Sequence, residues 1–75
     1  MTIRYWSRVQ FRDRAGEPKE ERFAEVPFDN ISDARRVAQA RVRQGVADEG
    51  WREPVIHVLE CSTDELVEET TLPGT

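Results

Sequence analysis

The segment 2–12, TIRYWSRVQFR, places two kinds of side chain at alternate positions, and this alternation constrains the fold more than any other feature of the chain. One set of positions holds Ile3, Tyr5, Ser7, Val9 and Phe11, and the other holds Arg4, Trp6, Arg8, Gln10 and Arg12. Successive side chains of a β-strand point to opposite faces of a sheet. The pattern therefore predicts a half-buried strand whose more polar face carries a tryptophan.

A β-hairpin is expected to follow this strand. The stretch DRAGEPK supplies turn residues around Ala15-Gly16, and the segment 20–28 is the predicted returning strand. A turn centred on Ala15-Gly16 opposes Ser7 to Ala24, Tyr5 to Val26 and Ile3 to Phe28, which brings apolar side chains together. In this register Phe23 lies on the same face as Trp6. A β-bulge would shift the register by one residue.

A helix is predicted from the N-cap candidates of the segment 29–33 to Gln44. Its apolar side holds Ile31, Ala34, Val37, Ala38 and Val42, and its opposite side holds Arg35, Arg36, Gln39 and Arg43. Gly45 is the expected C-terminal stop.

The rest of the chain is expected to form a loop and two strands. The loop covers 46–54 and carries Trp51, the first strand is the segment 55–62, VIHVLECS, and 66–72 could add a shorter strand. The predicted fold class is α+β, with a small antiparallel-rich sheet, one helix packed on one face and the order β-β-α-β followed by a final β. A single domain is expected over 1–72, and 73–75 is a C-terminal tail.

Charge is segregated along the 75 residues. The net charge of −4 divides into +3 over 1–16, −3 over 17–29, +3 over 30–45 and −7 over 46–75. Such blocks either neutralise one another in the fold or steer a charged partner. The single cysteine allows no internal disulfide, and no apolar run approaches the ~18 residues of a membrane span. A cytoplasmic protein is therefore expected, with no membrane partner.

His57 and Cys61 are the only histidine and the only cysteine of the chain. On a strand they share a face but lie roughly 13 Å apart, too far for a nucleophile and its base. Cys61 is therefore expected to be a small core residue, and His57 a strand histidine with a hydrogen-bond partner or a role in pH sensing or contact.

Catalytic motifs are missing from the sequence. Adjacent carboxylates on a strand point to opposite faces, and the four scattered glycines cannot build a phosphate-binding loop. We therefore expect no catalytic residue, no metal site, no cofactor and no enzyme activity.

The segment 55–62 is apolar on both faces, yet one helix covers only one face of a sheet. The other face is expected to show a patch that binds a partner. The predicted contact residues are Arg4, Trp6, Arg8 and Phe23, with Arg35, Arg36 and Arg43 as a second, basic strip. In the alternative, the 46–54 loop or the tail covers Trp6, which then packs against Trp51.

The leading functional hypothesis is a non-enzymatic protein-binding module, as a monomer or a homodimer. Small chains of this type serve as inhibitors, adaptors or regulatory subunits, including those that phage and mobile elements carry. The alternative is a single-stranded nucleic-acid-binding protein that uses Trp6 and its neighbouring arginines, although a pI near 4.9 opposes it. A third hypothesis is an accessory subunit of an enzyme.

Overall fold

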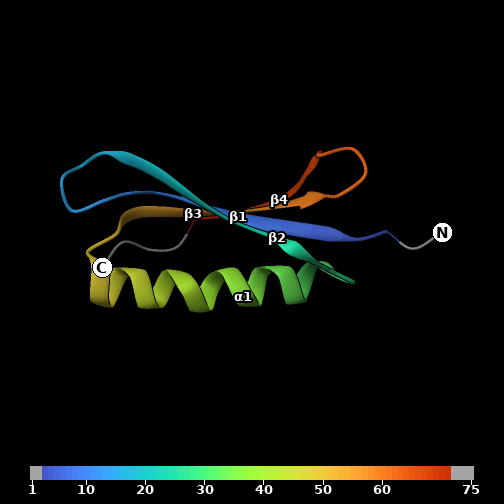
Figure 1. Cartoon of the computed structure of the whole chain (residues 1–75), viewed down its shortest axis with the longest axis horizontal. Helices are drawn as coiled ribbons and strands as arrows, with labels where there is room; N and C mark the ends of the chain where they lie inside the picture. Colours follow the sequence, from blue (N-terminus) through green and yellow to red (C-terminus); the bar gives the residue numbers. More distant parts are fainter. Residues whose placement is uncertain (1–2, 72–75) are drawn as a thin grey trace.

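The computed structural model describes residues 3–71, which form an antiparallel sheet with one helix along one face (Figure 1). The elements are β1 (Tyr5–Arg12), β2 (Pro18–Phe28), α1 (Ile31–Gln44), the π-helical η1 (Gly45–Glu49), β3 (Arg52–Glu60) and β4 (Leu66–Thr71). The strand order in the sheet is β2-β1-β3-β4. The predicted α+β class, with an antiparallel sheet and one helix, is confirmed. The predicted tail at 73–75 lies outside the described residues.

The turn of the first hairpin is longer by one residue than the sequence suggested. Gly16 has φ +85°, and its N–H donates to the Asp13 carbonyl at 2.9 Å. This is a three-residue loop closed by a glycine in the left-handed region, and it shifts the pairing. Ser7 opposes Phe23, so the register that opposed Ser7 to Ala24 is wrong.

This register separates Phe23 from Trp6, which the sequence analysis placed on one face. Phe23 is half-buried and packs against the core beneath α1. Trp6 occupies the next position of β1 after Tyr5 and before Ser7, and therefore points to the other side of the sheet. The expected Trp6–Phe23 patch does not form.

A bulge of several residues interrupts β2 near its C-terminal end. Ser7 pairs with Phe23 and Tyr5 pairs with Phe28, so the residues 24–27 of β2 oppose Trp6 alone. The surplus residues are pushed away from β1. Val26, which was predicted to face Tyr5, is instead 77% exposed.

The helix α1 begins at a side-chain cap and ends at Gln44, as predicted, but a further helical turn follows it. The Asn30 Oδ1 accepts the Asp33 N–H at 2.8 Å. The side chains on its buried face are small, which lets the helix lie close to the sheet; they are Ala34, Ala38 and Val42. Gly45 caps α1 as expected, but it keeps right-handed helical angles and begins the π-helical turn η1, which ends at Gly50 with φ +71°.

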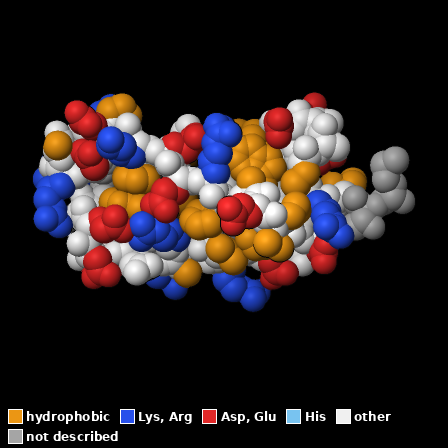
Figure 2. Space-filling model, in the orientation of Figure 1, with side chains coloured by type: hydrophobic (Ala, Val, Ile, Leu, Met, Phe, Trp, Pro, Cys, Tyr) orange, Lys and Arg blue, Asp and Glu red, His pale blue; other side chains and the backbone are white. Residues whose placement is uncertain are grey.

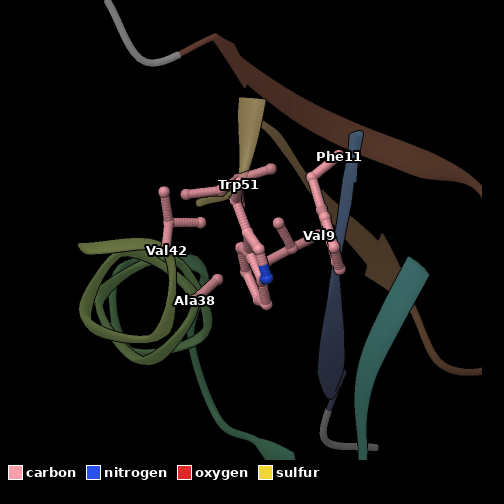
Figure 3. Packing of buried hydrophobic residues seen from close by; sticks show 6 residues of the cluster. Val9, Phe11, Ala38, Val42 and Trp51 are labelled. Atoms are coloured by element: carbon pink, nitrogen blue, oxygen red, sulfur yellow. The ribbon is translucent and has the colours of Figure 1, made fainter. Parts of the chain in front are cut away.

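Trp51 fills the core beside this turn (Figure 3). Its ring stacks on Phe11 with 3.7 Å between centroids, and the Arg41 guanidinium lies 4.5 Å from its centroid. A Cβ at residue 45 would collide with the indole, so glycine is needed there for space. Trp51 lies in the connection between η1 and β3, within the segment 46–54 that was predicted as a loop, although η1 and the start of β3 occupy most of that segment. The alternative in which it packs against Trp6 is wrong, because Trp51 lies on the helix side of the sheet.

The strand β3 is buried on both faces, as its sequence indicated. Ile56 and Val58 oppose Val9 and Ser7 of β1, while Leu59 opposes Trp6. The strand ends at Glu60, and Cys61 is exposed in the following turn. The prediction of Cys61 as a core residue is therefore wrong. No helix within residues 3–71 is long and apolar enough to cross a membrane.

Candidate functional site

Trp6 lies on the sheet face opposite α1, which we call the open face, but its ring is not free. The side chain is 8% exposed. Its Nε1–H donates to the Asp64 Oδ1 at 3.2 Å, and the Arg22 guanidinium lies 5.5 Å from the ring centroid. The turn after β3 and an arginine of β2 therefore cover Trp6, in place of the 46–54 loop that was considered for this role.

A polar network crosses the open face beside Trp6. The Arg8 Nε–H donates to the His57 Nδ1 at 3.0 Å, and the His57 Nε2 lies 2.8 Å from the Glu69 Oε2. Arginine is always protonated, so Nδ1 accepts and we assign the ring proton to Nε2, which donates to Glu69. Arg8 also lies 3.9 Å from Glu20, which receives the Arg22 Nε–H at 2.8 Å.

This network contains at least one side chain from each of the four strands. Its arginines lie next to the carboxylate of Glu20, so opposite charges meet within the network. The hydrogen bond from Arg22 lowers the pKa of Glu20. His57 is buried and has a partner on each ring nitrogen, as the sequence analysis expected of it. Arg8, a predicted contact residue, is thus committed to partners within the chain.

The predicted basic strip on α1 is divided by its ion pairs. Arg35 donates to both oxygens of Glu68 at 2.7 and 2.8 Å, so it is neutralised against β4. Arg36 is exposed, with Asp33 at 3.8 Å, and Arg43 is exposed. The predicted contact residue Arg4 lies 3.7 Å from Asp29 at the surface.

Arg41 was not among the predicted contact residues, yet it is the most engaged arginine of the helix. It donates to Glu21 at 3.0 and 3.2 Å and lies 2.6 Å from Glu49. These hydrogen bonds raise the pKa of Arg41. Its position over Trp51 and between carboxylates on β2 and η1 makes it structural.

An apolar hollow lies at the outer edge of β2, beside α1 (Figure 2). We call this hollow the β2 groove, and it is lined by Arg22, Phe23, Ala24, Glu25, Val26, Phe28 and Val37. The bulge of β2 produces it by turning Val26 outward, while Val37 projects from the helix and is also exposed.

Sequence reasoning found only Phe23 of this set. The other apolar members looked like parts of one continuous strand and of the apolar side of a helix, both of which suggest burial. The one available signal was Pro27, which cannot donate in a sheet ladder and is tolerated at edges and bulges.

Metal ligation and nucleobase stacking can each be compared with the side chains that the structure describes. Residues 3–71 contain no group of three or more His, Cys, Asp and Glu side chains that could hold a metal ion. The buried ring of Trp6, with Arg22 over it, offers no free surface on which a nucleobase could stack.

Comparison of the chain with protein-family models, with curated proteins and with solved structures found no significant match.

Proposed function

We propose that the protein is a small, non-enzymatic protein-binding module that makes contact through the β2 groove. The observation that carries this proposal is the exposed apolar surface at the bulge, where Val26 is 77% exposed beside Phe23, Phe28 and Val37. An apolar hollow rimmed by polar side chains is typical of an interaction site in a small protein.

The pairing of the sheet on either side of the bulge also supports the proposal. The segment 24–27 leaves the ladder, but both of its ends are held by pairing, Phe23 to Ser7 and Phe28 to Tyr5. An irregular segment on a rigid scaffold presents side chains without losing much conformational entropy on binding. The module would act as an inhibitor, adaptor or regulatory subunit.

The test compares two variants with the same substitution at different edges of the sheet. Val26→Glu places a charge in the groove, and Val67→Glu places it on β4, where Val67 is 41% exposed. Immobilised wild-type protein captures partners from a host extract, and each captured protein is purified and titrated by calorimetry.

We expect Val26→Glu to weaken binding about 30-fold, because a central apolar contact contributes on the order of 2 kcal/mol. Val67→Glu should leave the affinity within about 2-fold, as substitutions outside the contact usually do. Equal affinities of wild type and Val26→Glu for every purified partner would refute the proposal.

A further inference from the structure

The β2 groove contains both a protruding side chain and a hollow, which is the property that a two-fold contact requires. Val26 projects from the bulge, and Phe23, Phe28 and Val37 line the hollow next to it. In a symmetric dimer each copy uses the same patch, so a protrusion on one copy must find a hollow on the other. We propose that a second copy of this chain occupies the groove, an inference that rests on the proposed function.

The charges at the rim favour the same occupant. Arg22 and Glu25 line the groove together and have opposite signs. Arg22 stays 62% exposed although Glu20 holds its Nε, and Glu25 is exposed and makes no salt bridge within residues 3–71. A two-fold axis beside Ala24 brings Arg22 of each copy toward Glu25 of the other, so a single patch supplies both halves of two ion pairs.

The backbone of β2 determines what kind of dimer this is. Its outer edge carries Pro18 and Lys19 at one end and the bulge with Pro27 at the other, and all of these oppose the addition of another strand. The two sheets therefore do not join into one. Side chains make the contact, and the small Ala24 at its centre allows the copies to approach closely.

The small number of residues in the patch predicts a weak dimer: seven residues line the groove, against roughly 20–30 on each side of a standard interface. Contacts well below the standard interface of about 1,600 Å² are generally weak or transient. We expect a dissociation constant on the order of 10–100 μM, which corresponds to about −5.5 to −7 kcal/mol.

Sedimentation velocity measures this directly, over about 5 μM to 1 mM chain, a range that brackets weak association. Wild type is expected to move from the mass of one 8.7 kDa chain toward twice that mass. Val26→Glu should shift the midpoint of the transition at least about 10-fold upward, while the matched control Val67→Glu should follow wild type.

A charge exchange tests the proposed geometry of the rim. Arg22→Glu and Glu25→Arg should each weaken the dimer about 3- to 10-fold, and the double variant should recover most of the loss, as a double-mutant cycle of paired charges does. Thermal unfolding of each variant separates loss of contact from loss of fold, since Arg22 also lies over Trp6.

Three results would overturn the inference: a single-chain mass at every concentration, a dimer that Val26→Glu leaves unchanged, or a double charge variant weaker than both single ones. The first of these, together with capture that still depends on Val26, would leave the proposed function standing and remove only the second copy as its partner. If the protein neither forms a dimer nor captures any partner in a way that depends on Val26, the groove has no part in its function.

Discussion

Ser7 follows the alternating pattern of β1, but its hydroxyl group lies among apolar side chains. Its side chain lies on the helix side of β1, between Phe23 and Val58 on the neighbouring strands, and is fully buried. The Oγ has no hydrogen-bond partner within residues 3–71. A buried hydroxyl without a partner costs about 1–3 kcal/mol relative to one in water.

Replacing that hydroxyl is therefore expected to stabilise the protein. Ser7→Ala should raise the free energy of unfolding by about 1 kcal/mol, because it removes the unpaired group and leaves a space smaller than a methyl group. Urea denaturation measures the difference. The control Ser62→Ala changes an exposed serine that donates to Glu60, and its effect should stay within about 0.5 kcal/mol. A loss of stability in Ser7→Ala would mean that the hydroxyl is bound after all.

The junction of α1 with η1 shows how an element is shaped by what packs against it. A glycine after a predicted helix usually marks its end. Gly45 instead has φ −63° and ψ −40°, angles that any residue adopts, and its special property is the absence of a Cβ facing the Trp51 ring. The π-helical turn follows, and Trp51 then enters the core.

Gly45→Ala is expected to change stability in the direction opposite to the usual one. Glycine-to-alanine in a helix normally stabilises by about 0.5–1 kcal/mol. Here the added methyl group meets a ring stacked on Phe11, and overpacking of this kind costs about 1–3 kcal/mol. Chemical denaturation should show the loss, and pairing the change with Trp51→Phe should recover part of it in a double-mutant cycle. A more stable Gly45→Ala protein would contradict the tight contact.

At the scale of the whole molecule, the alternating charge blocks of the sequence meet one another in space. Arg8 and Glu20 join the first two blocks, and Arg35 and Glu68 join the last two. Of the two interpretations of these blocks, mutual neutralisation accounts for the contacts that the structure shows. The contact surface that we propose, the β2 groove, is apolar.

The polar network of the open face gives this neutralisation a pH dependence. Glu20 has a pKa below its ordinary value of 4.5 in the folded state, chiefly because Arg22 donates to it. A carboxylate of this kind stabilises the fold above its unfolded pKa, and the contribution disappears as the pH falls through the folded pKa.

Wild type should therefore exceed Glu20→Gln in free energy of unfolding at pH 7, and the difference should shrink as the pH falls below about 4.5. The difference at pH 7 is expected to be about 0.2–1 kcal/mol, since Glu20 lies near the surface. Urea titrations at several pH values follow it, with Glu17→Gln as a control whose carboxylate lies 3.6 Å from Lys19. A difference that is constant with pH would rule out the ionised Glu20–Arg22 contact as its source.

Local patterns in the sequence sufficed to predict the α+β class, the strand of 5–12, the helix up to Gln44 and the buried character of 56–59, because periodicity depends only on neighbouring residues. The loop length at Gly16, the bulge at 24–27 and the placement of Trp51 were decided by tertiary structure. Each depends on contacts between residues distant in the chain: a strand's register on the partner it meets, and a glycine's role on the ring beside it. A shift of one residue in that register moved Phe23 to the helix side and, together with the bulge, opened the groove that we propose as the binding site.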